Sequence, residues 1–275
     1  MLQRTSRVVL AAALLAAAPL AAQNVLLYDS NSNDSTAEAV LDAMLQAGDI
    51  ESLTVAGSDD FGGLLATGGW NLVVMDLPSD TPTDSSWYVG MARAIDDGAC
   101  AIQTAWLDED ALALAPAFEV AIGAEHNAIP FYVWNADPLF SSPQSVPSPM
   151  AVAGDEWGTN GFYLDPVGSA YAAGGFVAAP AAGQAAIVVG NGGRTIFNGF
   201  LFDDFSPANA DADAYDDIQE LIENEVRQTL AAGCAASRGT LTQAIPTLGE
   251  WGLLASALAL GAAGFVALRR RRAAA

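Results

Sequence analysis

Short apolar runs recur along the chain and alternate with segments in which apolar residues repeat at helical spacing. The runs that predict strands are residues 25–28, 53–56, 72–75, 99–105, 129–134, 186–189 and 195–200. Short runs of this kind, without polar alternation, are typical of strands that are buried on both faces of a sheet. The last two runs flank the glycine-rich segment 190–193, so we expect them to pair as a hairpin.

Helical spacing is clearest after the first of these strands. Ser35 and Glu38 form the S-x-x-E pattern that satisfies free amides at a helix start, and Gly48 follows the last apolar position. Further helices are expected near residues 88–95, over 111–122 with an interruption near Pro116, and over 218–230. Single helices between buried strands predict an α/β domain over residues 23–234. Its sheet is expected to be doubly wound and mostly parallel, with helices on both faces.

The predicted domain is strongly acidic. All 32 aspartate and glutamate residues lie between residues 23 and 268, where the arginines number only four. The chain contains no lysine, and its formal net charge at pH 7 is −22. Such a surface repels phosphate backbones, so the charge argues against nucleic acid as a partner. Because the field is negative and no lysine follows, we interpret segment 190–193 as a turn rather than a phosphate site.

The first 22 residues have the organisation of a secretory signal peptide. Arg4 and Arg7 supply the positive start, residues 8–15 supply the apolar core, and small residues up to Ala22 precede the expected cleavage site. We therefore expect signal peptidase to cut before Gln23, so that the mature protein is exported. The alternative is an uncut anchor, but the apolar run is short for a membrane-spanning helix.

A second apolar segment predicts a transmembrane helix. Residues 251–268 form an uncharged stretch of 18 residues, close to the lower limit for crossing a membrane, and four arginines follow at 269–272. Arginines in this position stay on the cytoplasmic side, and Trp251 suits the membrane interface. The acidic domain would then lie outside the cytoplasm, tethered by a linker over residues 235–244.

The residues that precede and open this helix form a distinctive motif: Ile245, Pro246, Thr247, Leu248, Trp251 and Gly252. Together with the helix and the arginines, residues 245–272 resemble the IPTL-CTERM sorting signal of Gram-negative bacterial surface proteins. The resemblance implies that an exosortase-type transpeptidase in the inner membrane recognises the chain, cleaves it near the motif and transfers the domain to the cell surface. A simple membrane anchor is the alternative.

Four segments of the domain carry a second resemblance: residues 25–29, 72–76, 136–140 and 192–200. They are similar to the class I glutamine amidotransferase-like fold, in its non-catalytic branch of surface proteins. A flavodoxin-like or receiver-like sheet is the competing interpretation.

Active amidotransferases of this class need a cysteine on a glycine-rich nucleophile elbow and a histidine that a glutamate orients. Cys100 stands too early in its predicted strand, and Thr104 or Ala105 occupies the expected elbow. His126 is the single histidine and has no His-x-Glu context, so we interpret it as a solvated loop residue. We therefore expect no catalytic residues and no cofactor.

Cys100 and Cys234 are the only two cysteines of the chain. Disulfides persist in exported proteins, and a bridge here would fasten the end of the closing helix to the sheet. Two free buried thiols are the alternative, because sequence does not reveal pairing geometry.

An acid-rich segment precedes the closing helix. Asn209, Asp211, Asp213 and Glu220 take positions 1, 3, 5 and 12 of a calcium-binding loop. Position 6, however, is Ala214, where such a loop needs glycine for its tight turn. We interpret the segment as an acidic first turn that complements the dipole of the closing helix, and we expect no metal site.

Polar residues at the carboxyl ends of the predicted strands remain as candidates, because ligands of open α/β sheets bind there. They are Asp29, Ser30, Asn31, Asp76 and Thr104. One hypothesis is an exported, surface-sorted protein whose non-catalytic α/β ectodomain has a binding or structural role. The other is an exported hydrolase or sugar-active enzyme that uses Asp29 or Asp76 with a divalent cation.

Overall fold

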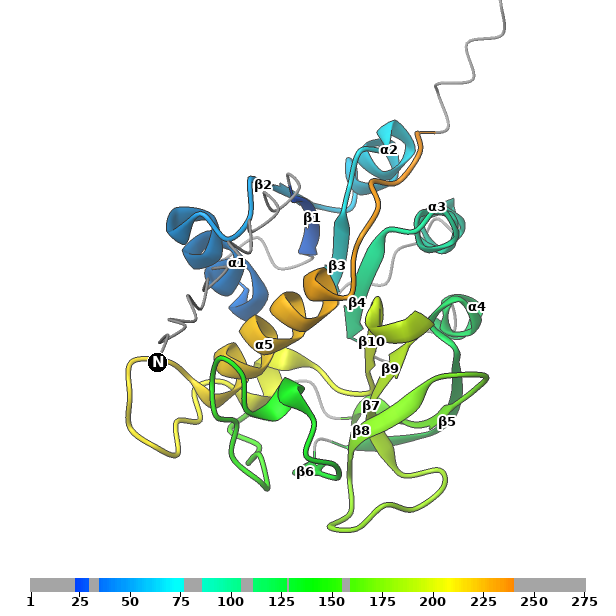
Figure 1. The fold of residues 1–275 in the computed structure, drawn as a ribbon. Helices are drawn as coiled ribbons and strands as arrows, with labels where there is room; N and C mark the ends of the chain where they lie inside the picture. The colour runs from blue at the N-terminus through cyan, green and yellow to red at the C-terminus, as the bar shows by residue number, and fades with distance from the viewer. Residues whose placement is uncertain are drawn as a thin grey trace, which may run out of the picture.

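The structure, a computed structural model, describes residues 23–29, 35–76, 86–104, 111–127, 129–154 and 159–239. Within them a ten-stranded sheet is covered by helices (Figure 1). The strand order is β2-β1-β3-β4-β10-β9-β7-β5, with β8 paired to β9 and β6 paired to β8. The domain therefore has the α/β class that the sequence pattern predicts.

Five neighbouring strands form a parallel half of the sheet. They are β2 (Ser52–Ala56), β1 (Asn24–Asp29), β3 (Leu72–Asp76), β4 (Cys100–Thr104) and β10 (Thr195–Asn198). The residues of β3, β4 and β10 are all buried, as are those of β1 from Val25 onward. Burial from both sides explains why these strands are continuous apolar runs rather than alternating ones.

The other half of the sheet is antiparallel, so the sheet as a whole is mixed. It comprises β5 (Val120–Asn127), β6 (Tyr132–Val133), β7 (Thr159–Pro166), β8 (Tyr171–Gly175) and β9 (Ala185–Gly190). The predicted hairpin is confirmed, because Gly190 pairs with Thr195 across the short 3-10 helix η3 (Asn191–Gly193). A two-strand hairpin reverses the chain, so β10 is parallel to β4 and antiparallel to β9.

Helices cover both faces of the sheet. They are α1 (Thr36–Ala47), α2 (Phe61–Thr67), α3 (Ser86–Asp96), α4 (Ala111–Leu114) and α5 (Asp217–Ala231). Val25 and Leu27 of β1 pack in the core beneath α1 and α5. Leu26 and Tyr28 of the same strand pack in the core beneath α2, α3 and α4. Alternate side chains thus enter two separate cores, which is what a doubly wound sheet requires.

Local signals set the ends of α1. The Ser35 hydroxyl accepts a hydrogen bond from the Glu38 amide at 3.2 Å, and Gly48 ends the helix in the left-handed conformation, with φ of 80°. Both features agree with the predicted cap and end. The sequence pattern did not predict α2, because its first turn contains Gly62 and Gly63, which lower helix propensity.

The predicted helix over residues 111–122 is wrong in its second half. α4 is followed by a 3-10 helix, η1 (Ala115–Phe118), and then by β5. Pro116 has no amide donor for a helical hydrogen bond, and Glu119 adopts φ of 60°, which turns the chain out of the helix. The remaining apolar residues of that run therefore enter a strand.

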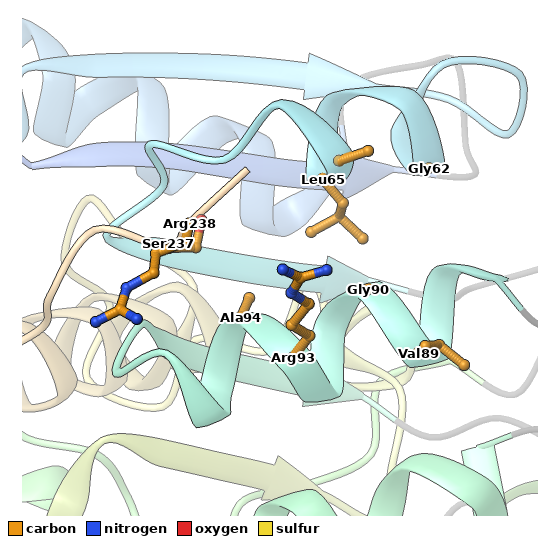
Figure 2. Close-up of a pocket in the computed structure, with 9 residues that line it drawn as sticks. Gly62, Leu65, Val89, Gly90, Arg93, Ala94, Ser237 and Arg238 are labelled. Carbon is orange, nitrogen blue, oxygen red and sulfur yellow. The ribbon is translucent and has the colours of Figure 1, made fainter. Parts of the chain in front are cut away.

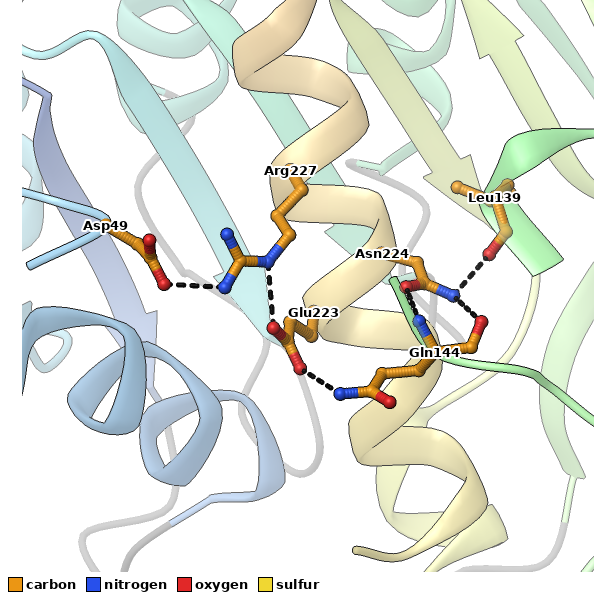
Figure 3. Close-up of polar contacts among 6 residues, drawn as sticks. All are labelled: Asp49, Leu139, Gln144, Glu223, Asn224 and Arg227. Atoms are coloured by element: carbon orange, nitrogen blue, oxygen red, sulfur yellow. Dashed lines mark hydrogen bonds and ion pairs between the residues drawn. The ribbon is translucent and has the colours of Figure 1, made fainter. Parts of the chain in front are cut away.

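Buried Asn224 ties α5 to the loop that follows η2 (Pro138–Phe140). Its Nδ2 donates to the carbonyl oxygens of Leu139 at 3.0 Å and Gln144 at 2.9 Å, and its Oδ1 accepts from the Gln144 amide at 3.0 Å (Figure 3). One turn away, Arg227 pairs with Glu223 of α5 and with Asp49 beyond the end of α1. These contacts hold α5 between α1 and the loop.

The chain after α5 lies against the body over residues 235–239, where the sequence places the start of a linker. The Ala235 amide donates to the Gly98 carbonyl at 2.9 Å, and the Ser237 amide donates to the Trp70 carbonyl at 2.8 Å. Cys234, just before this segment, forms a disulfide with Cys100 of β4. Figure 1 shows the segment in orange, running from the end of α5 past α3 towards α2.

The described residues contain no helix that is long and apolar enough to cross a membrane. The predicted signal peptide at 1–22, the transmembrane helix at 251–268 and the motif from Ile245 to Gly252 lie outside the described residues.

Candidate functional site

Four polar side chains form a row across the carboxyl ends of neighbouring parallel strands. Asp29 of β1 lies opposite Asp76 of β3, and Thr104 of β4 lies opposite Asn198 of β10. Side chains alternate along a strand, and the residue two positions before each of these four belongs to the core beneath α1 and α5. The four polar side chains therefore face α1 and α5, and we call them the carboxyl-end row.

Two loops bring further polar groups to this row. The Ser35 amide, at the start of α1, donates to Asp29 Oδ2 at 3.4 Å. The Thr36 hydroxyl donates at 2.9 Å to Oδ1 of Asp203, which belongs to the 3-10 helix η4 (Phe202–Phe205). Sequence reasoning singled out Asp29, Asp76 and Thr104 but not Asn198 or Asp203; Ser30 and Asn31 lie outside the described residues.

Asp76 is the most perturbed acid of the row. Its side chain has 0% exposure, and burial raises its pKa well above the ordinary value. The charges of Asp203 and Asp29 raise this pKa further, whereas hydrogen bonds with Ser35 and Thr104 lower it in part. Burial thus favours the protonated form of Asp76, and a protonated carboxyl is a poor ligand for a cation.

Glu225 of α5 is a second buried acid with a raised pKa. It is fully buried, and its Oε2 accepts a hydrogen bond from Asn198 Nδ2 at 3.0 Å. Burial raises the pKa of Glu225 to about 8, although the bond from Asn198 acts in the opposite direction. The sequence could not identify this pair, because Glu225 stands on a helix and only tertiary packing buries it.

The expected elbow carries no activated nucleophile among the described residues. The Thr104 hydroxyl is buried and donates to the Met75 carbonyl at 3.4 Å. Cys100 is fully buried and is bonded to Cys234, so its sulfur is not a free thiol. Ala105 lies outside the described residues.

The interpretation of His126 as a solvated loop residue is wrong. It lies in β5, is 7% exposed and packs against the rings of Phe176 and Tyr163, with ring centroids 4.1 and 5.0 Å away. Its Nδ1 is 2.6 Å from the Asn127 carbonyl oxygen, and its Nε2 is 3.0 Å from that of Gly199. Burial lowers the pKa of His126, so the imidazole is a neutral structural group that joins β5 to the end of β10.

The glycine-rich hairpin turn binds a carboxylate of the chain itself. The Asn191 amide donates to Glu119 Oε2 at 3.0 Å, and the Asn191 side chain donates to the Ala117 carbonyl at 2.8 Å. The Asn191 amide, a group that can bind an anion, is thus already bonded to Glu119 of the same chain. This agrees with the interpretation of segment 190–193 as a structural turn.

A separate cavity of about 250 Å³ lies between α2, α3 and the segment at 237–238. Arg93 and Arg238 line it together with small and apolar residues, and Figure 2 shows their guanidinium groups pointing in different directions. Because α2 and α3 cover the opposite face of the sheet, this cavity is not continuous with the carboxyl-end row.

Acidic side chains converge at a third place, in the segment before α5. The ligand atoms of Asp211, Asp213 and Glu220 all lie within 4.8 Å of one another. The two aspartates are exposed, whereas Glu220 is buried. The sequence spacing indicated this group, although we interpreted it as a helix-capping segment.

Comparison with solved structures relates the α/β body to several proteins at low sequence identity. A protein described as ThuA-like from Bacteroides uniformis is 11% identical, with 78% of this chain and 93% of that chain covered and a TM-score of 0.51. An alpha-L-fucosidase isoenzyme 2 from Paenibacillus thiaminolyticus is 12% identical, with 76% and 33% covered and a TM-score of 0.50. These similarities concern the fold alone, which is compatible with an amidotransferase-like domain.

A Thermoplasma acidophilum protein described as a GMP synthase component also matches, at 12% identity, with 76% of this chain and 95% of that chain covered and a TM-score of 0.49. A search of curated protein sequences found no match. A family model, the IPTL-CTERM motif, matches residues 243–272. That motif points to export, to the cell surface and to processing by an exosortase-type enzyme. The chain therefore carries an IPTL-CTERM motif behind an α/β body that shares its fold with the ThuA-like protein.

Proposed function

We propose that this protein is exported, sorted to the cell surface and active there as a binding or structural protein, with an α/β ectodomain that performs no catalysis. In this proposal, signal peptidase removes residues 1–22. The helix at 251–268 then holds an intermediate in the inner membrane, where an exosortase-type transpeptidase cleaves near Ile245 to Leu248. The IPTL-CTERM match over residues 243–272 is the observation that carries the proposal.

The chemistry of the body supports a non-catalytic role. Asp76 is fully buried and has a raised pKa, Cys100 is bonded to Cys234, and His126 contacts two backbone carbonyls. None of these groups is positioned as an activated nucleophile with its base, which acyl transfer by this fold would require. In the row, Asp29 instead accepts a hydrogen bond from the Ser35 amide, and the Thr104 hydroxyl donates to the Met75 carbonyl.

The sorting step is tested with the body tagged in the native host. Wild type should lose its C-terminal peptide, whereas Pro246→Ala and Thr247→Ala should accumulate at the inner membrane with residues 269–272 retained. Thr242→Ala, just outside the tetrapeptide, is the matched control and should be processed as wild type. Pro246 biases the preceding residue to an extended conformation, which suits the groove of a processing enzyme. Identical fractionation of all four proteins, each with residues 269–272 retained by intact mass, would refute the assignment.

The adjacency of Asp29 and Asp76, with Asp203 nearby, favours a second candidate function, a hydrolase or sugar-active enzyme that uses carboxylates with a divalent cation. The test is turnover of chromogenic glycosides and esters with Mg²⁺ or Mn²⁺. Activity that Asp29→Asn and Asp76→Asn abolish, and that the exposed control Asp59→Asn retains, would favour this second function. Equal background rates in all four proteins would support the non-catalytic one.

A further inference from the structure

We propose that residues 209–220 form a calcium-binding site whose ligands are the side chains of Asp211, Asp213 and Glu220. A calcium ion binds oxygen ligands at about 2.3–2.6 Å, so two oxygens on one ion are at most about 5 Å apart. The ligand atoms of these three residues all lie within 4.8 Å of one another. One ion can therefore contact all three carboxylates without a change in the path of the backbone.

A buried, unsatisfied oxygen in the cluster points independently to a ligand. Glu220 is only 3% exposed, and its Oε2 has no hydrogen-bond partner among the described residues. A buried acceptor of this kind is unfavourable unless something satisfies it. Glu220 comes from the first turn of α5, whereas the aspartates come from the preceding loop, so the buried carboxyl faces the two exposed ones.

Asn209, on the same loop, offers a further side-chain oxygen as a ligand for the ion. Its Nδ2 donates to the Asp213 carbonyl at 3.1 Å, while its Oδ1 is buried without a partner among the described residues. The aspartates are oriented by the loop backbone, because Asp211 Oδ1 accepts from the Asp213 amide and Asp213 Oδ1 accepts from the Tyr215 amide. Each aspartate still has its second carboxylate oxygen for an ion.

The electrostatics of the loop also favour a cation. Burial raises the pKa of Glu220 to about 7, and the charges of Asp211 and Asp213 contribute next. Asp217 and Glu223 act in the same direction. A divalent cation among these carboxylates would offset their mutual repulsion.

The sequence argument against calcium does not apply to this backbone. It rested on Ala214, at the position where a calcium loop needs glycine for a left-handed turn. In the structure the left-handed residue is Ala212, with φ of 60°, and Ala214 does not have positive φ. The alternative interpretation, an acidic first turn of α5, explains only why an acidic residue stands at position 220. It explains neither the convergence of Asp211 and Asp213 nor the unsatisfied Glu220 oxygen.

The experiment measures thermal unfolding of the full chain in detergent, after chelation, with CaCl₂ added to millimolar concentration. Sites of this kind outside the cell bind calcium with dissociation constants of about 10⁻⁴–10⁻³ M. We expect a saturable rise in Tm of about 5 °C or more, because an ion that binds only the folded state stabilises it by mass action. NaCl at equal ionic strength should give a much smaller shift.

Variants distinguish a site from diffuse screening. Asp211→Asn and Asp213→Asn change exposed side chains, so both should fold as wild type and lose the calcium-dependent shift. Asp59→Asn, an exposed carboxylate outside the loop, should retain it. Glu220→Gln should raise the Tm of the calcium-free protein, because it removes a buried acid, and should also lose the response.

A direct probe of the ion uses Tb³⁺ in place of calcium. Tyr215 lies within the loop and can transfer excitation energy to a bound Tb³⁺ ion. Sensitised emission should appear in wild type and disappear in Tyr215→Phe and Asp211→Asn, while Tyr215→Phe keeps the Tm shift with calcium. A calcium shift equal in Asp211→Asn and Asp59→Asn, or no larger than that with NaCl, would overturn the proposal in favour of the helix-capping interpretation.

Discussion

Asn198 at the carboxyl end of β10 donates a hydrogen bond to Glu225 of α5, with Nδ2 and Oε2 3.0 Å apart and both residues fully buried. The other carboxyl oxygen, Oε1, and the amide oxygen of Asn198 have no partner among the described residues. Glu225 and Asp76 are thus two buried acids with raised pKa values at the carboxyl end of the sheet. The arrangement makes stability depend on pH.

We expect the protein to lose stability as pH rises from about 5 to about 8. The pKa of Glu225 is about 8 in the folded protein and 4.5 in its ordinary state. Between these values the folded state binds more protons than the unfolded state, so stability falls with rising pH, by up to about 1.4 kcal/mol per unit for this group. Asp76, whose pKa is also raised by burial, acts in the same direction.

Glu225→Gln should flatten this pH dependence and raise Tm at pH 8, because the amide keeps an acceptor for Asn198 and has no charge to bury. Thermal unfolding from pH 5 to pH 9 measures both effects. Glu51→Gln, at an exposed position, is the control and should follow wild type. A variant slope equal to that of wild type would mean that Glu225 is not the titrating group.

Reduction of the Cys100–Cys234 bridge should destabilise the body by about 2–5 kcal/mol, since the bridge closes a loop with a sequence separation of 134 residues. Unfolding with and without a phosphine reductant measures the loss. Cys234→Ser should match reduced wild type and show no further response to the reductant. An unchanged Tm, together with two free thiols titrated in denatured protein, would support the alternative of two buried thiols.

Gly68→Ala should displace the segment at 235–239, whereas Gly69→Ala should not. Both glycines have positive φ, so both substitutions carry a similar backbone penalty of about 1 kcal/mol. Only at Gly68 would a Cβ overlap the backbone of Gly239; at Gly69 the space is open. Hydrogen exchange of the Ser237 amide, which donates to the Trp70 carbonyl, measures the displacement. Equal exchange in the two variants would contradict the close packing of this segment.

Asn224→Ala should destabilise the body by about 2–4 kcal/mol, because it leaves three buried or partly buried backbone groups of Leu139 and Gln144 without their partners (Figure 3). Gln144→Ala is the matched control: it removes a side-chain contact to Glu223 but keeps the backbone bonds to Asn224, so its effect should be below about 1 kcal/mol. Chemical denaturation measures both. Similar losses in the two variants would show that the side chains, not the buried backbone, hold the loop.

Local patterns determined much of this protein. The buried strands β1, β3 and β4, the cap of α1 and the β9–β10 hairpin follow from residues close in sequence, because hydrophobic runs, capping side chains and tight turns act over a few residues. The sorting motif is local in the same sense, since an enzyme would read it as a short peptide. The same local pattern marked the interruption at Pro116 but missed the strand after it, because Glu119 adopts a left-handed conformation that turns the chain into β5.

Only the tertiary structure decided which polar groups meet. Thr36 reaches Asp203 across 167 positions of sequence, Asn198 reaches Glu225 through the packing of α5, and Glu220 is buried opposite two loop aspartates. The raised pKa values of Glu225 and Glu220 arise mainly from burial, which depends on every element packed around them. A sequence pattern states which side chains are polar. The distances between those side chains, and their exposure to water, depend on contacts between residues that are far apart along the chain.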